Sequence, residues 1–102
     1  MNQAHLMAQV KKMQAEMTKA QEELANTIVS GSAAGGTVTV DVSCDQRVKR
    51  IRIDKEAVDP DDVETLEDLV TVAVNDALTK SNEAAQKRMG GVTGGMRIPG
   101  LM

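Results

Sequence analysis

The side chains of this chain most able to do chemistry are its twelve lysines and arginines, because repeated cations bind the phosphates of a polyanion. They fall into three sets along the sequence: Lys11, Lys12 and Lys19; then Arg47, Lys49, Arg50, Arg52 and Lys55; then Lys80, Lys87 and Arg88, with Arg97 in the tail. Acidic residues concentrate between Asp54 and Asp76, so the net charge of −3 conceals a segregated distribution. The residues alone leave two interpretations open, a nucleic-acid surface or solvated faces of helices and strands.

The sequence contains no arrangement of residues suited to catalysis or to metal binding. His5 is the single histidine and lies near the N-terminus, and the single cysteine, Cys44, has no histidine partner in the pattern. The carboxylates around Asp59 are typical of helix capping rather than of an acid–base pair. We therefore predict that the protein is not an enzyme and takes no metal, cofactor or small-molecule substrate.

The chain contains no Phe, Tyr or Trp. Single-strand binders and most sequence-specific RNA modules stack bases on aromatic rings, so their absence favours double-stranded DNA held by its phosphates and shape. A core made only of Val, Leu, Ile, Ala and Met also buries less area per residue, which favours an oligomer.

The length of 102 residues predicts one domain. No apolar run approaches the length of a membrane span, and the N-terminus lacks the apolar segment of a signal peptide. With one cysteine no disulfide framework can form, so we expect a cytoplasmic protein with no membrane partner.

The stretch from Thr37 to Asp54 predicts two paired β-strands at the centre of the fold. Val38, Val40, Val42 and Cys44 alternate with polar residues, as in a half-buried strand. In the following strand Val48 is out of phase with Ile51 and Ile53, which predicts a bulge or offset near Lys49. Residues 27–32 are expected to form a first, edge strand, and residues 33–36 the turn after it.

Two helices flank these strands in the sequence. Residues 2–26 predict the first, because apolar residues recur in a heptad seam: Leu6, Val10, Met13, Met17, Ala20 and Leu24. This seam fits either a helix lying on its own sheet or a contact with a second chain. The second helix is expected to begin with Asp59 as its cap and Pro60 in the first turn, run to about Arg88 and stop at Gly90-Gly91.

The predicted fold is therefore α+β in the order α-β-β-β-α, with both helices covering a three-stranded antiparallel sheet. The helices would span roughly 37 and 43 Å, against roughly 23 Å for the strands, so each must overhang. We expect the start of the first helix and the end of the second to project side by side as an arm. Residues 1–89 would form the domain, and residues 90–102 a flexible Gly-rich tail.

This order resembles the YbaB/EbfC family of nucleoid-associated DNA-binding proteins. The resemblance rests on these stretches: residues 6–14, Gly31, residues 36–40, residues 51–54, residues 66–70, residues 73–77 and residues 94–100. Two departures from the family are the absence of a Gly-rich leader and the poor match of residues 44–47. The resemblance implies a homodimer whose paired helical arms grip duplex DNA like tweezers, in the nucleoid, contributing to its organisation and to gene regulation.

The cations on the overhanging helix ends are our expected phosphate contacts: Lys11, Lys12, Lys19, Lys80, Lys87 and Arg88. Secondary candidates are Arg47, Lys49, Arg50 and Arg52, and the seam expected to serve the dimer or the core comprises Leu6, Val10, Met13 and Met17. The alternative is a helical dimer that binds partner proteins through this seam and has only incidental affinity for DNA.

Overall fold

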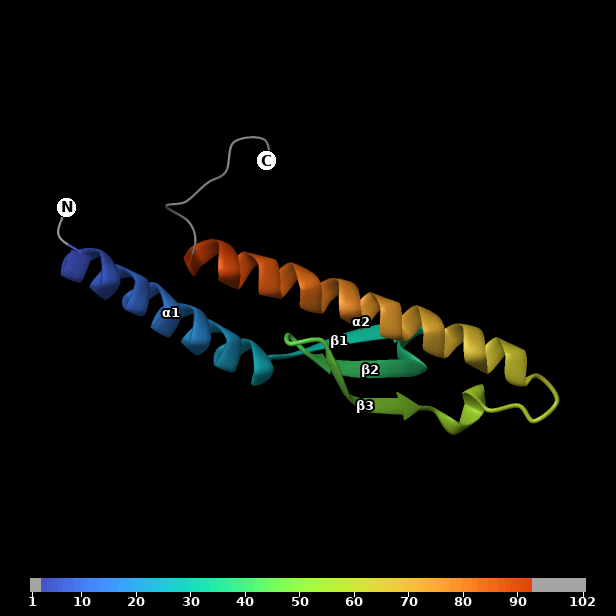
Figure 1. The fold of residues 1–102 in the computed structure, drawn as a ribbon. Helices are drawn as coiled ribbons and strands as arrows, with labels where there is room; N and C mark the ends of the chain where they lie inside the picture. Colours follow the sequence, from blue (N-terminus) through green and yellow to red (C-terminus); the bar gives the residue numbers. More distant parts are fainter. Residues whose placement is uncertain (1–2, 93–102) are drawn as a thin grey trace, which may run out of the picture.

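The computed structural model describes residues 3–92, which form the predicted α-β-β-β-α order (Figure 1). The elements are α1 (Gln3–Ala25), β1 (Ile28–Ala33), β2 (Val38–Ser43), β3 (Arg47–Ile53) and α2 (Val63–Val92), with short 3-10 turns at Ala34–Gly36 and Lys55–Ala57. The predicted helix start at Asn2, most of the tail and Arg97 lie outside the described residues. The molecule measures 70 × 28 × 17 Å with a radius of gyration of 19.4 Å, well above the roughly 13 Å of a compact domain of this length.

The sheet is antiparallel in the order β1-β2-β3, and its register confirms the predicted bulge. Asp41 pairs with Arg50 and Val42 pairs with Val48, which leaves Lys49 as the extra residue. The alternation predicted for β2 is also confirmed, because Val38, Val40 and Val42 are fully buried. One face of the sheet therefore carries the core, and the other face is polar.

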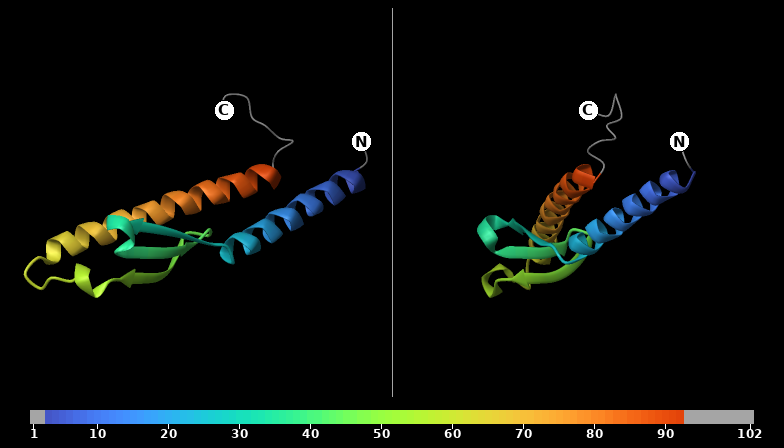
Figure 2. Two further views of the ribbon diagram at one scale, coloured as in Figure 1. Left: turned by 180° about the vertical axis from the view of Figure 1, so that it is seen from behind. Right: turned by 90° about the vertical axis from the view of Figure 1, so that its left-hand side faces the viewer.

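Helix α2 lies across β1 and β2 and closes the core (Figures 1 and 2). It approaches β1 closely at Gly31, where an added Cβ would lie 2.2 Å from the backbone nitrogen of Ala77 and 2.6 Å from the carbonyl oxygen of Ala73. Ala73 and Ala77 are fully buried there. Small residues on both elements thus let the helix and the strand pack backbone to backbone.

The same helix also blocks the outer edge of β1. The Ser32 backbone N–H donates to the Asp76 carboxylate at 3.0 Å, and the Lys80 ammonium donates to the Ser30 carbonyl oxygen at 3.3 Å. An edge strand with free donors and acceptors is a template for unwanted pairing, so these two side chains protect it.

The expectation that both helices cover the sheet is wrong for α1. In both views of Figure 2, α1 extends away from the sheet, and only its last turns are buried, at Ala20 and Leu24. The reason is geometric: α2 already occupies the apolar face, and the opposite face of the sheet offers a polar surface to which the apolar seam of α1 is not complementary.

The start of α2 also differs from the prediction. The helix begins at Val63, and its cap is Asp62, whose carboxylate accepts the Thr65 backbone N–H at 3.3 Å and the Thr65 hydroxyl at 2.6 Å. Asp59 caps a preceding turn instead, accepting the Asp61 N–H at 2.9 Å. Several aspartates can cap from sequence alone, and the loop path selects the last of them.

The end of α2 lies beyond the predicted stop, because the helix continues through Gly90 and Gly91 to Val92. A helical glycine costs about 1 kcal/mol relative to alanine, whereas each residue added to an existing helix gains a hydrogen bond. A long preceding helix therefore carries the chain through two glycines.

Candidate nucleic-acid interface

Two helical segments project from the sheet, α1 and the C-terminal part of α2, and we call them the arms. Both are anchored at the β2–β3 turn, which we call the joint. The Cys44 backbone N–H donates to the carbonyl oxygens of Leu24, at the end of α1, and Thr27, at 3.0 and 2.9 Å. Cys44 itself is buried, as its place on the apolar face predicted. The β2–β3 turn is therefore a common anchor point for the arms.

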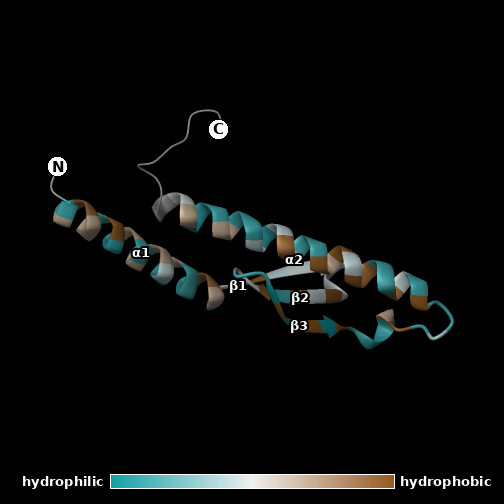
Figure 3. Cartoon of the chain, viewed as in Figure 1, coloured by the Kyte–Doolittle hydropathy of each residue, from teal (hydrophilic) through white to brown (hydrophobic). Residues whose placement is uncertain are grey.

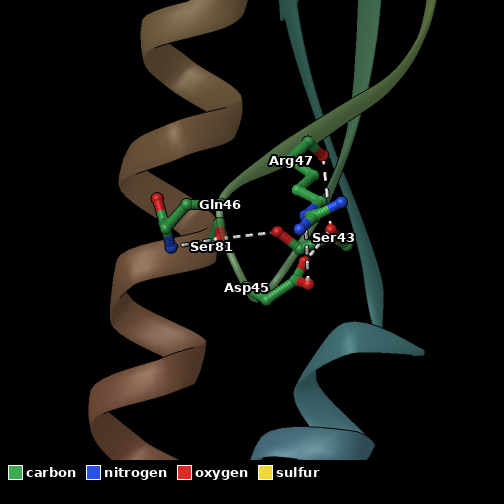
Figure 4. A network of polar contacts seen from close by, with 5 residues as sticks. All are labelled: Ser43, Asp45, Gln46, Arg47 and Ser81. Atoms are coloured by element: carbon green, nitrogen blue, oxygen red, sulfur yellow. Dashed lines mark hydrogen bonds and ion pairs between the residues drawn. The ribbon is translucent and has the colours of Figure 1, made fainter.

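A polar network ties the same turn to α2 (Figure 4). The buried Ser81 hydroxyl donates to the Ser43 carbonyl oxygen at 3.0 Å and accepts from the Gln46 side-chain amide at 2.7 Å. The Ser43 hydroxyl, also buried, donates to the Asp45 carboxylate. Gln46 adopts a left-handed backbone with φ of 70°, a conformation that non-glycine residues rarely hold without such support.

We expect Ser81→Ala to lower the free energy of unfolding by about 1 kcal/mol, because it removes two hydrogen bonds from a buried position. Urea denaturation measures this value. The matched control is Asn82→Ala, one residue along on the exposed side of α2, which is expected to change the stability by less than about 0.5 kcal/mol. Equal midpoints for the two variants would contradict a role for the network.

An ion pair joins the two arms above the joint. The Arg88 guanidinium lies 2.7 Å from the Glu23 carboxylate, so the end of α2 lies beside the last turns of α1 and not, as predicted, beside its start. The hydrogen bond from Arg88 lowers the pKa of Glu23, and the same bond raises the pKa of Arg88. Because the folded-state pKa of Glu23 is depressed, the pair stabilises the arms at neutral pH and is lost as the pH falls through that pKa.

The charged side chains on the distal half of α1 are all cationic. Residues 3–15 contain Lys11 and Lys12, several glutamines and no acidic residue, and all of them are exposed. Val92 lies about 6 Å beyond Arg88 along α2, whereas Lys12 lies about 16 Å beyond Glu23 along α1. Lys11 and Lys12 therefore project past the described end of α2.

The other cations predicted on the helix ends have different environments. Lys19 and Lys87 are exposed and have no hydrogen-bond or ion-pair partner within residues 3–92. Lys80 lies over the sheet rather than on the overhang, and its ammonium pairs with Asp76 at 3.2 Å. The hydrogen bond from the Ser32 N–H, followed by that from Lys80, lowers the pKa of Asp76.

The strand set of cations lies on the sheet, away from the arm tips. Arg47, Arg50 and Arg52 pair with Ser43, Asp41 and Thr39, the polar residues of β2, so they share the face opposite α2. Lys49 occupies the bulge.

The opposite end of the molecule is acidic. Residues 54–68 contain one lysine and the acidic residues Asp54, Glu56, Asp59, Asp61, Asp62, Glu64, Glu67 and Asp68. This segment includes the loop before α2, at the end of the long axis away from the arms (Figure 1). The two ends of the molecule therefore carry formal charges of opposite sign.

Two apolar surfaces remain uncovered in the single chain. Val48, Ile51 and Ile53 share the inner face with the buried row of β2 but are 47, 44 and 40% exposed, because α2 covers β1 and β2 rather than β3 (Figure 3). The distal seam of α1 is exposed as well, at Leu6, Val10, Met13 and Met17.

Within residues 3–92, no three His, Cys, Asp or Glu side chains come together in a way that could hold a metal ion. No helix in this part of the chain is both long enough and apolar enough to span a membrane.

Comparison with known proteins agrees with this architecture. Residues 1–96 match the YbaB/EbfC DNA-binding family. Proteins named nucleoid-associated protein are similar to this chain: that of Chloroflexus aurantiacus is 50% identical, over 95% of this chain and 97% of its own length, and that of Desulforamulus reducens is 54% identical, over 98% and 95%. An uncharacterized Helicobacter pylori protein shares the fold, with a TM-score of 0.78 and 21% identity, over 89% of this chain and 96% of its own. The chain belongs to the YbaB/EbfC DNA-binding family.

Proposed function

We propose that this protein binds double-stranded DNA through phosphate contacts with little reading of base sequence, and that it contributes to nucleoid organisation and gene regulation in the cytoplasm. The observation that carries the proposal is the acid-free, exposed surface of residues 3–15 at one end of an elongated molecule. Lysine and glutamine side chains, its main polar groups, donate hydrogen bonds to phosphate oxygens. The lack of any aromatic residue argues against a single-stranded ligand.

The acidic end of the molecule supports the same assignment. A polyanion is repelled by residues 54–68 and attracted by the distal arm, so the charge distribution orients the protein with its arms toward the duplex. We assign the phosphate contacts first to Lys11, Lys12, Lys19 and Lys87, whose ammonium groups are free of partners within residues 3–92. Lys80 and Arg88 can contact a phosphate only after their ion pairs with Asp76 and Glu23 are broken.

The functional unit we propose is a homodimer. A second copy would cover the row of Val48, Ile51 and Ile53 or the distal α1 seam, both of which leave large apolar side chains in water. Dimerisation also doubles every cationic surface. Small-angle scattering or sedimentation measures the mass directly, and a monomer at micromolar concentration would contradict this part of the proposal.

Fluorescence anisotropy of a labelled duplex, titrated with protein at several salt concentrations, tests the binding mode. We expect the logarithm of the association constant to fall linearly with the logarithm of salt concentration, and duplexes of unrelated sequence to bind alike. No binding at low salt would refute the proposed function.

Releasing Arg88 is expected to strengthen binding. Glu23→Gln removes the charge that holds the Arg88 guanidinium, so a phosphate can take its place and add about 0.9 to the magnitude of the salt slope. Glu22→Gln is the matched control, because it removes the same charge from the adjacent position, which has no ion-pair partner within residues 3–92. Equal gains for both variants would show that only net charge matters.

The exposed seam of α1 supports a second candidate, a module that binds partner proteins. Apolar burial is not screened by salt, so such a partner should remain bound at moderate ionic strength, where a phosphate-based complex weakens. Capture of one defined partner, with no duplex bound at physiological salt, would favour this candidate.

A further inference from the structure

The bulge in β3 determines which face of the sheet its arginines occupy. Without an extra residue at Lys49, strict alternation would place Arg47 on the face opposite to Arg50 and Arg52. With the bulge, all three pair with the polar row of β2 and stand on one face, while Val48, Ile51 and Ile53 stand together on the other. Bulges commonly re-aim side chains in this way. The outer face of the sheet therefore carries a row of three guanidinium groups.

The neighbours of this row suit a phosphate backbone. Ser30 and Ser32 of β1, with Thr39 of β2, add hydroxyl groups to the same face. Asp41 is the acidic residue on this face of the strands, and it is already engaged by Arg52 at 3.2 Å and by the Ser30 hydroxyl at 2.7 Å. Hydroxyls and arginines together form the usual donor set for phosphate oxygens.

The arginines are available to a ligand. Arg50 has no hydrogen-bond or ion-pair partner within residues 3–92. The side chains of Arg47 and Arg52 are 76 and 50% exposed, and their pairs with Asp45 and Asp41 are surface pairs, which contribute little and can be exchanged for a phosphate.

The row is also separate from the arms. The arginine row lies on the face of the sheet opposite α2, whereas Lys11 and Lys12 belong to the far end of α1, which extends away from the sheet (Figure 2). One straight duplex gripped at the arm tips would not need to touch the outer face of the sheet.

We propose that the outer face of the sheet is a second site for the sugar–phosphate backbone of duplex DNA, and that the protein thereby joins two duplexes. This inference rests on the proposed binding of one duplex by the arms. Arg50 and Arg52 are its central contacts, Arg47 extends the row, and Lys49 adds charge at the bulge. A protein that bridges duplexes compacts DNA as well as coating it.

A bridging assay with the full chain tests the second site. One duplex is immobilised on beads, protein is added, and the retention of a second, fluorescent duplex is measured against salt concentration. Wild-type protein is expected to retain the label, and Arg50→Ala/Arg52→Ala to lose it, with the salt slope of retention reduced in magnitude by about 1.8. Arg50→Lys/Arg52→Lys keeps the charge and should restore retention.

Two controls separate bridging from folding and from arm binding. Arg50→Ala alone removes no hydrogen bond or ion pair within the described chain, so its partial loss of retention cannot come from unfolding. Lys55→Ala removes one charge just after β3 and should leave retention unchanged. Affinity for a single free duplex should stay within about twofold of wild type in every sheet variant, because the arms are intact.

Unchanged retention in Arg50→Ala/Arg52→Ala would overturn the second site. A parallel loss of single-duplex affinity would also overturn it, because the arginines would then belong to the same footprint as the arms. Wild-type protein that binds no duplex at all would refute the proposed function itself, together with the inference that rests on it.

Discussion

Gly31→Ala is expected to destabilise the fold severely. The added methyl group would lie 2.2 Å from the Ala77 nitrogen and 2.6 Å from the Ala73 carbonyl oxygen, and both contacts are with backbone that cannot rotate away. Helix α2 must move off β1, which separates the buried valines of β2 from the alanines that cover them and shifts Asp76 and Lys80 away from the edge of β1. Overpacking of this kind costs about 3 kcal/mol or more, equivalent to a fall in melting temperature of roughly 12 °C or greater.

Gly90→Ala is the matched control, because it makes the same chemical change in the same small protein. An added Cβ at Gly90 meets no atom within 4 Å, and the residue lies in the helix, so alanine should stabilise by up to about 1 kcal/mol. Calorimetry at one protein concentration compares the two variants, since any oligomer makes the melting temperature depend on concentration. Melting temperatures for Gly31→Ala at or above that of wild type would contradict the close approach of α2 to β1.

Replacing the three exposed arm lysines together, Lys11→Ala/Lys12→Ala/Lys87→Ala, is expected to give the largest loss of DNA affinity. Each phosphate contact removed should lower the magnitude of the salt slope by about 0.9, so three contacts account for about 2.7 per protomer that engages the duplex. If binding extrapolated to 1 M salt is unchanged, the same factor predicts a loss of roughly 500-fold at 0.1 M. These lysines have no hydrogen-bond or ion-pair partner within residues 3–92, so stability should not change.

The control for this experiment compares single variants. Lys87→Ala and Lys55→Ala each remove one positive charge, but Lys55 follows β3 at the end of the molecule away from the arms. Only Lys87→Ala is expected to change the salt slope, while both should change the long-range attraction equally. A slope that stays at the wild-type value in the triple variant would move the interface away from the arm tips.

Local sequence determined the elements of this protein and much of their detail. Alternation over residues 38–42 fixed which face of β2 is buried, and the phase change between Val48 and Ile51 located the bulge. The concentration of acidic residues after Asp54 was equally evident from the sequence. Such features depend on neighbours within a few residues, so they persist whatever the rest of the chain does.

The tertiary structure decided how those elements are used. Periodicity showed that α1 and α2 each have an apolar face. Only the packing shows that α2 covers the sheet and that α1 projects from it. The sheet has one apolar face, and α2 occupies it. The same placement engages Lys80 and Arg88 with partners within the chain, and makes Gly31 a point of backbone contact between β1 and α2. These roles depend on contacts between residues that are distant in sequence, and neither composition nor spacing shows which of those side chains come into contact.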